Sequence, residues 1–407
     1  MACLRLTFVL VCLCLLRPFA VSAQDLGDPS EDEAETARFH FGPVAVTPVL
    51  DIQQVGVDTN VFNDSENRQR DFTASIGPSG RYWMRFGRLR LKGESGLAYH
   101  YFHEFSTQRS FGTENQLQLS LPLNRFTPFV KGGYDNTRRR PDYEIDARVR
   151  TKRRTAGAGL DIRAGARTVL RFEGESNDID FDDDAVFLGS SLGEVLNRRE
   201  ELYGIGLHRR LTPLTTFVVS GGYQRDRFKR SPVRDADSYR VLAGFELDPF
   251  ALISGTAFVG YRSFSTLDED TPDFKGVIAN ATVAYVLRST RFGFRVRRDA
   301  HYSFEISEPF YIATELMGEV TQKITSNWDM VGRVGRTTLD YQRLVSLESS
   351  ERTDTEWLAG GGIGRRVGRS ARIGFDVNHL RRESPLGAAR EYEGWRIGGS
   401  LTYGVSQ

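Results

Sequence analysis

Apolar and polar residues alternate along most of the chain from about residue 44 onward. In one clear stretch, Tyr239, Val241 and Ala243 alternate with Arg240 and Gly244. A period of two indicates a β-strand with two unlike faces, because successive side chains point to opposite sides of a sheet. No long stretch has the 3.6-residue period of an amphipathic helix. The pattern therefore predicts an all-β fold.

The connections between the predicted strands fall into two classes that alternate along the chain. Eight short turns are expected at residues 86–87, 122–124, 164–165, 211–213, 248–249, 289–290, 325–327 and 368–370. Nine longer, charged loops are expected at about residues 60–71, 104–114, 135–146, 175–198, 225–237, 264–273, 299–309, 342–354 and 383–392. This arrangement makes about 18 strands, with 16 as the alternative, and places both chain ends on the short-turn side.

The asymmetry between turns and loops points to a membrane protein. A water-soluble sandwich has no reason to gather its long loops at one end, whereas bacterial outer-membrane barrels combine short periplasmic turns with longer extracellular loops. Only a sheet without free edges can cross the bilayer, because unpaired backbone groups in hydrocarbon are costly. We therefore expect a transmembrane antiparallel up-and-down β-barrel whose apolar face meets lipid and whose charged face meets a wet lumen.

Charged residues on the predicted inner face indicate a polar passage, because arginine is rarely buried without a partner. Barrels of about 16 to 18 strands leave an aqueous channel. Ten basic groups face seven acidic ones on this face when Glu315, Glu319 and Asp329 are included, which predicts at most a weak preference for anions. The expected pore-lining residues are Arg88, Arg90, Lys92, Glu94, Arg171, Glu173, Arg240, Glu246, Arg291, Arg295, Arg297, Arg333, Arg372 and Asp376.

The N-terminus has the pattern of a secretory signal peptide. Arg5 precedes an apolar run at residues 6–16, and Val21, Ser22 and Ala23 supply a small-residue cleavage site. Removal after Ala23 would also remove all three cysteines. We expect residues 1–23 to be the signal peptide, 24–43 a flexible acidic periplasmic segment, and 44–407 the barrel.

Composition excludes several classes of function. The chain has 54 basic and 53 acidic residues, and this balance argues against a nucleic-acid partner. A mean hydropathy of −0.38 argues against a bundle of transmembrane helices. The chain contains no H-E-x-x-H metal motif. We therefore expect neither an enzyme nor a cofactor.

Two charged segments near the longest loop are candidate binding sites. Asp178, Asp180 and Asp182 alternate as in a calcium loop, but Asp183 and Gly189 occupy positions where an EF-hand needs Gly and Glu. They are a weak metal candidate, with a solvated acidic loop as the alternative. A basic patch could hold lipopolysaccharide phosphates or acidic polysaccharide, or be an ordinary solvated loop. It comprises Arg138, Arg139, Arg140, Arg148, Arg150, Lys152, Arg153 and Arg154.

Apolar residues in the longest loop need cover from water. Val186, Phe187, Leu188, Leu192 and Leu196 lie within it. We expect either that residues 178–196 fold into the barrel mouth and narrow the pore, or that they form a short helix above the rim.

The last strand is similar to the signal read by the barrel-assembly machinery. Arg396, Gly398, Leu401 and Tyr403 follow its order of a polar residue, a glycine and two apolar residues. Many such proteins end at a terminal Phe, whereas this chain runs on to Gln407. An edge strand presented in this way is ready to pair with another strand.

The chain resembles the putative β-barrel porin 2 family of Gram-negative outer-membrane proteins over about residues 44–405. The resemblance lies in Pro48–Leu50, Asp58–Phe62, Leu211–Pro213 and Ser220–Tyr223. It implies a barrel in the outer membrane, in contact with lipid and lipopolysaccharide, and supplies no catalytic residues. We expect a passive, water-filled pore for small hydrophilic solutes. The alternative is an accessory or assembly protein of exopolysaccharide or capsule secretion.

Overall fold

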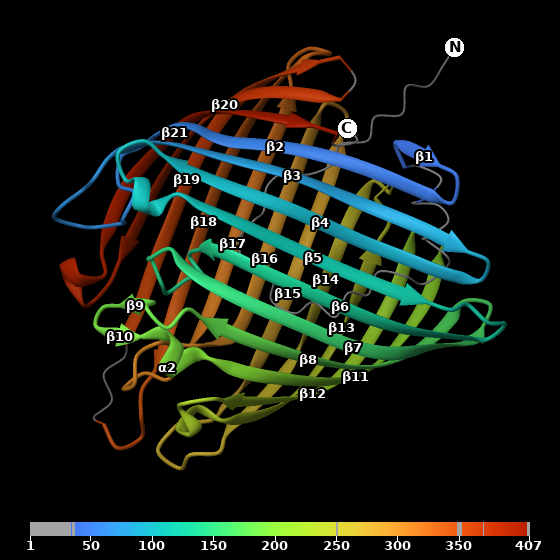
Figure 1. The fold of residues 1–407 in the computed structure, drawn as a ribbon, viewed down its shortest axis with the longest axis horizontal. Helices are drawn as coiled ribbons and strands as arrows, with labels where there is room; N and C mark the ends of the chain where they lie inside the picture. The colour runs from blue at the N-terminus through green and yellow to red at the C-terminus, as the bar shows by residue number, and fades with distance from the viewer. Residues whose placement is uncertain (1–33, 35–36, 250, 348–351, 369, 405–407) are drawn as a thin grey trace.

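The computed structural model describes residue 34 and residues 37–404, except 250, 348–351 and 369. The expected signal peptide and the first part of the expected acidic segment lie outside the described residues. Within them, the chain forms a single closed barrel of 18 long antiparallel strands (Figure 1). This confirms the fold class and the strand number expected from the alternating pattern.

The first half of the barrel contains β2 (Val44–Asp58), β3 (Asp71–Phe86), β4 (Leu89–Phe102), β5 (Ser110–Ser120), β6 (Phe126–Arg139), β7 (Val149–Gly165), β8 (Thr168–Phe181), β11 (Arg198–Thr212) and β12 (Thr215–Phe228). The second half contains β13 (Ala236–Leu247), β14 (Ile253–Thr266), β15 (Phe274–Leu287), β16 (Thr290–Tyr302), β17 (Phe310–Lys323), β18 (Trp328–Gln342), β19 (Arg352–Val367), β20 (Ala371–Glu383) and β21 (Tyr392–Tyr403).

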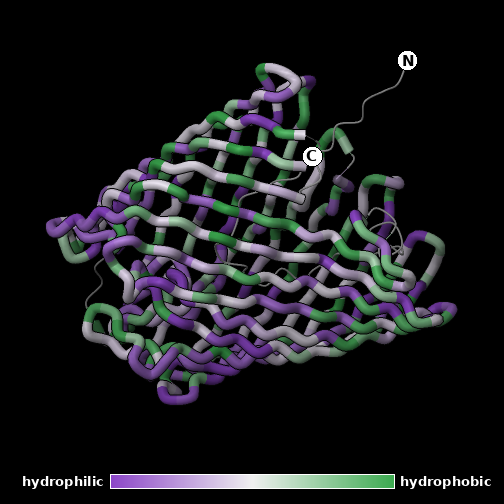
Figure 2. The backbone as a smooth tube through the Cα atoms, turned by 45° about the horizontal axis from the view of Figure 1, so that its top comes forward, coloured by the Kyte–Doolittle hydropathy of each residue, from purple (hydrophilic) through white to green (hydrophobic). Residues whose placement is uncertain are grey.

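Each long strand pairs with its neighbours in sequence, and β2 pairs with β21 to close the barrel. The front and back walls cross in projection because the strands are tilted (Figure 1). Hydrophilic and hydrophobic residues alternate along the strands (Figure 2). Closure pairs the backbone of every wall strand on both sides, which is the condition for crossing hydrocarbon.

The remaining elements are short. They are β1 (Phe39–Phe41), β9 (Val186–Phe187), β10 (Ser190–Ser191), α2 (Leu192–Leu196) and the 3-10 helices at Ser106–Gln108, Pro232–Arg234 and Gly387–Ala389. No helix among the described residues is long and apolar enough to span a membrane. β1 pairs with the start of β2 across a turn at Gly42, so strand structure begins before residue 44.

Several segments differ from the expected boundaries; the loop expected at residues 135–146, for example, lies at 140–148. Two further differences have a clear structural cause. The turn after β7 lies at residues 166–167, because the pairing register shifts between Arg163 and Gly165 and extends the hairpin. The longest loop begins after Phe181 rather than at residue 175. β8 continues to this point because Ile179 and Phe181 are buried on its inner face, where they join an apolar cluster.

Candidate functional site

The inner face of the barrel is the candidate site, and the pairing register identifies it. On β13, Tyr239 and Val241 are 63% and 58% exposed on the outer surface. Arg240 lies between them and faces inward, in register with Gly222 of β12 and Arg262 of β14. The apolar outer wall and the charged inner wall are thus two faces of the same strands.

The structure places nearly all of the expected pore-lining residues on this inner face. Arg90, Lys92 and Glu94 occupy alternate inward positions of β4. Arg88 does not lie on a strand, because it occupies the two-residue turn between β3 and β4. The other expected residues lie in the inward rows of β8, β13, β16, β18 and β20; they are Arg171, Glu173, Arg240, Glu246, Arg291, Arg295, Arg297, Arg333, Arg372 and Asp376.

Ion pairs between neighbouring and next-but-one strands neutralise much of this inner charge. Arg333 lies 2.9 Å from both Glu319 of β17 and Asp376 of β20. Arg372 lies 2.6 Å from Asp329 of β18. Further pairs join Arg171 to Asp161, Lys131 to Glu173 and Glu175, and Arg295 and Arg297 to Glu315.

Two of the expected inner cations lack such a partner. Neither Arg240 nor Arg291 makes an ion pair within the part of the chain that the structure describes. The guanidinium charges of these two residues are thus not neutralised by an ion pair.

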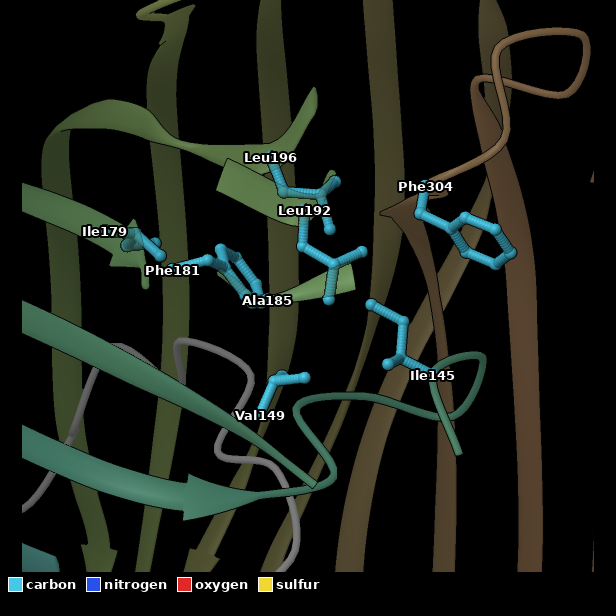
Figure 3. Packing of buried hydrophobic residues seen from close by; sticks show 8 residues of the cluster. All are labelled: Ile145, Val149, Ile179, Phe181, Ala185, Leu192, Leu196 and Phe304. Atoms are coloured by element: carbon cyan, nitrogen blue, oxygen red, sulfur yellow. The ribbon is translucent and has the colours of Figure 1, made fainter. Parts of the chain in front are cut away.

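Three segments meet at the long-loop end of the barrel and form its outer mouth. They are the β6–β7 loop (residues 140–148), the β8–β11 loop (residues 182–197) with α2, and the β16–β17 hairpin end (residues 299–313). One apolar cluster joins them (Figure 3). Its buried members are Ile145, Val149, Ile179, Phe181, Ala185, Leu192, Leu196 and Phe304.

The β6–β7 loop reaches strands on the far side of the barrel. The Tyr143 hydroxyl donates a hydrogen bond of 2.7 Å to Glu315 of β17. Arg382 of β20 donates to the Tyr143 carbonyl and pairs with Asp146 at 2.9 Å. Arg390 donates to the carbonyl of Glu144. These anchors lie more than 150 residues later in the sequence, on or next to strands of the opposite wall, so the loop lies across the lumen.

The side chain of Glu144 fixes the same loop to the β16–β17 hairpin end. Its carboxylate accepts hydrogen bonds from Ser303 Oγ at 2.8 Å and from the backbone N–H of Phe304 at 3.1 Å. Burial and the nearby Asp142 raise the pKa of Glu144 to about 8. The group is therefore largely protonated at neutral pH.

The β16–β17 hairpin end itself leans into the mouth. β15 pairs with β16 only as far as Arg298, so residues 299–302 leave the wall. One face of the hairpin packs Phe310 and Ile312 against Phe264 of β14. The other face packs Tyr311 in a cluster with Tyr143. Apolar contacts on both faces show that this hairpin is inside the structure rather than at its surface.

Sequence reasoning did not identify Tyr143, Glu144 or the β16–β17 hairpin end as parts of the mouth. A usable signal was the unbroken apolar run from Phe310 to Ala313, because a strand covered on both faces loses its alternation. The expectation for residues 178–196 holds in part. Leu192 and Leu196 of α2 are buried against the mouth, but the β6–β7 loop is the segment that crosses to the opposite wall.

The weak metal candidate residues Asp178, Asp180 and Asp182 lie on β8 and directly after its end rather than in a solvated loop. Asp178 and Asp180 point outward from the barrel and pair with Lys229 at 2.7 and 2.6 Å. Asp182 pairs with Lys152 at 2.9 Å. Among the described residues, no three acidic, histidine or cysteine groups gather as metal ligands, because basic residues already occupy these carboxylates.

The expected basic patch is divided by strand alternation. Arg138, Arg150, Lys152 and Arg154 lie on the outward rows of β6 and β7, whereas Arg139 and Arg153 lie on the inward rows. Arg140 donates to the carbonyls of Val61 and Asp146 inside the mouth, and Arg148 lies over the Phe102 ring.

The expected assembly signal lies on the closing strand. Arg396 and Gly398 of β21 face inward, and Arg396 pairs with Asp58 at 3.2 Å. Leu401 and Tyr403 face outward and align with Ile52 and Leu50 of β2.

Comparison with solved structures finds the same architecture. The BenF-like porin from Pseudomonas fluorescens Pf-5 superposes with a TM-score of 0.50 at 10% identity, covering 89% of this chain and 98% of that chain. OpdK from Pseudomonas aeruginosa gives 0.47 at 10% identity, covering 88% and 97%. OccAB4 from Acinetobacter baumannii gives 0.46 at 10% identity, covering 88% and 96%. At 10% identity, the likeness to the BenF-like porin concerns the fold alone.

No curated protein matches the chain. The family described as Putative beta-barrel porin 2 matches residues 39–403, which is the whole barrel including β1. With a closed barrel, an apolar outer wall and a charged lumen established, this match shows that the chain belongs to the putative β-barrel porin 2 family of the bacterial outer membrane.

Proposed function

We propose that the barrel is a passive outer-membrane pore for small hydrophilic solutes, and that the β6–β7 loop sets its width. The observation that carries this proposal is the attachment of that loop to the opposite wall through Tyr143 and Arg382. A solute that enters from outside must pass this loop before it reaches the charged lumen. The fold and the family are those of a channel.

The wall charges support a mild selection among solutes. Most inner cations are paired, whereas Arg240 and Arg291 have no ion-pair partner among the described residues. Unmatched charge on a low-dielectric wall attracts counter-ions. We therefore infer a modest preference for anionic over cationic solutes.

The width is tested by single-channel recording in a planar bilayer. Replacing residues 141–147 with two glycines leaves a four-residue connection of a common hairpin type. We expect ohmic conductance from the native barrel and a several-fold larger conductance from this variant. The matched control replaces residues 104–108 of the β4–β5 loop with two glycines. The 3-10 helix of that loop buries no residue, so this control should leave conductance unchanged.

Two outcomes would contradict the proposal. Absence of conductance from both the folded native barrel and the folded β6–β7 loop variant would exclude a pore. Equal conductance from both would show that the β6–β7 loop does not set the width. Heat-dependent gel mobility confirms folding of each variant, since closed barrels resist unfolding in detergent. In a deletion strain, loss of polysaccharide export with unchanged solute uptake would favour the secretion accessory instead.

The charge preference is tested by reversal potentials in a KCl gradient. Arg240→Gln combined with Arg291→Gln should reduce the preference for chloride, because it removes two inner cations that make no ion pair. Arg298→Gln is the control, since Arg298 lies on the outward row of β16 and donates to Thr314. An unchanged reversal potential in the double variant would refute a role for these two arginines.

A further inference from the structure

The lipid-facing wall contains a groove on the outward faces of β7, β8, β11, β12 and β13. Its volume is about 750 Å³, within the range of about 300–1,000 Å³ that is usual for ligand pockets. Small residues line it, namely Ala158, Gly174 and Gly221. Tyr203 and Tyr239 project beside them, 52% and 63% exposed. The groove is therefore apolar and opens toward the hydrocarbon.

Backbone crowding does not explain the outward glycines Gly174 and Gly221 of this groove. A Cβ added at Gly174 would lie 3.7 Å from the Tyr203 ring, and one added at Gly221 would lie 3.7 Å from Ile205. Both are ordinary contacts. Larger apolar residues would thus be tolerated here and would favour packing with lipid. Their absence keeps a hollow open.

A band of charge lies above the groove on the same strands. Arg154 lies four residues from Ala158, Arg199 four residues from Tyr203, and Arg225 four residues from Gly221. In each case the arginine is nearer the long-loop end of the barrel. At about 3.4 Å per residue this separation is about 14 Å along the strand. We use the name outer basic band for six outward-facing residues: Arg150, Lys152, Arg154, Arg199, Arg225 and Lys229.

The outer basic band carries more positive than negative charge. Its six cations face four outward carboxylates on β8, β11 and the residue after β8: Asp178, Asp180, Asp182 and Glu201. Arg199 is exposed and makes no ion pair within the described part of the chain. The side chain of Arg154 is 58% exposed although it contacts two of the carboxylates. Cationic groups are thus available to an external anion.

The outer basic band does not continue onto β3, β4 and β5. Toward the outer ends of β3, β4 and β5, the outward residues are Phe72, Tyr101 and Phe111. Charge placed above the groove on the same strands indicates one amphipathic ligand.

We propose that the groove and the outer basic band together bind one lipopolysaccharide molecule of the outer leaflet. An acyl chain lies in the groove between the tyrosines, and the phosphate groups of the lipid contact the band. Guanidinium groups bind phosphate oxygens in a bidentate manner. Anionic headgroups and hydrocarbon chains meet at the membrane interface, where tyrosine side chains also concentrate. This proposal depends on the outer-membrane location and not on the pore function.

The test measures retention of lipopolysaccharide on the purified full-length barrel by native mass spectrometry. Gly221→Leu fills the groove, and Lys152→Gln with Arg154→Gln removes two cations from the band. Gly332→Leu is the matched control for the groove, because Gly332 is an outward glycine of β18 with open space around it. Arg298→Gln with Arg336→Gln is the matched control for charge on another part of the outer wall.

We expect native barrel and both controls to retain one lipopolysaccharide, and each test variant to lose at least tenfold in retention. Phosphatidylglycerol, offered at the same concentration, should not be retained. Equal retention by test variants and controls would overturn the proposal, as would equal binding of phosphatidylglycerol. A dimer that disappears in Gly221→Leu would assign the groove to a second copy of the chain and would also overturn it.

Discussion

At the scale of single residues, the environment of each charged side chain determines what it does. Arg333 and Arg372 are held in ion pairs with carboxylates of other strands, whereas Arg240 faces the same lumen without one. Alternation in the sequence predicted that such residues face inward. It could not predict their partners, because pairs such as Arg333 with Asp376 join strands that are not adjacent.

Glu144 gives the outer mouth a dependence on pH. Burial raises the pKa of this carboxyl from its ordinary 4.5 to about 8, so ionisation is less favourable in the docked loop than in a solvated one. Docking is fully stabilised below about pH 4.5, weakens as the pH rises from 4.5 to about 8, and levels off above that. We therefore expect more frequent transitions to larger conductance at pH 9 than at pH 6.

The control for this prediction is Glu144→Gln, which keeps the shape of the side chain and removes its ionisation. This variant should show the same transition frequency at both pH values. If the native protein and Glu144→Gln respond equally to pH, another group is responsible. If the transition frequency of the native protein does not change with pH, ionisation of Glu144 does not weaken the docking of the loop.

At the scale of elements, alternation predicted the wall strands well but not the segments inside the barrel. Wall strands have one lipid face and one wet face, so their pattern is regular. The β16–β17 hairpin end is covered on both faces, and its run from Phe310 to Ala313 lost the alternation. The β6–β7 loop could not be placed from sequence, because its anchors Glu315 and Arg382 are distant in the chain.

Arg234 is expected to hold the β16–β17 hairpin end in the mouth. Its guanidinium group donates to the backbone carbonyls of Ser303, Glu305 and Pro309. Arg234→Gln should leave buried carbonyls without donors and destabilise the hairpin by about 1–3 kcal/mol. We expect faster protease cleavage within residues 299–313 of the folded barrel, together with noisier single-channel currents.

Arg230→Gln is the matched control for this prediction. Arg230 lies in the β12–β13 loop, as Arg234 does, and its side chain is 55% exposed. Its cleavage rate should equal that of the native protein. Equal cleavage of Arg234→Gln and Arg230→Gln would show that the hairpin end is held by its apolar packing alone.

At the scale of the whole molecule, closure of the barrel depends on the pairing of β2 with β21. The short-turn and long-loop classes predicted 18 strands with both ends on one side, and the structure agrees. The sequence did not indicate the register shift between Ile52 and Val55 of β2. Gln54 at this shift has a φ of 55°, a left-handed conformation that is unusual for a residue other than glycine.

The two closing strands approach each other very closely at Gly56, and that contact makes closure testable. A Cβ at position 56 would lie 2.0 Å from the carbonyl oxygen of Ile397 and 2.5 Å from the Cα of Gly398. Both are backbone atoms of β21, so no side chain can move aside. Gly56→Val should therefore disturb the final pairing step and cost at least the roughly 1–3 kcal/mol typical of overpacking.

The measurement is the fraction of protein that migrates as a compact, heat-modifiable barrel after refolding into lipid vesicles. Gly77→Ala on β3 is the matched control, because its added Cβ would meet the nearest atoms at an ordinary 3.6 Å. We expect nearly complete folding of this control and a strongly reduced compact fraction for Gly56→Val. Equal fractions would mean that β2 and β21 can close in another register, and that the glycine contact does not define how the barrel is completed.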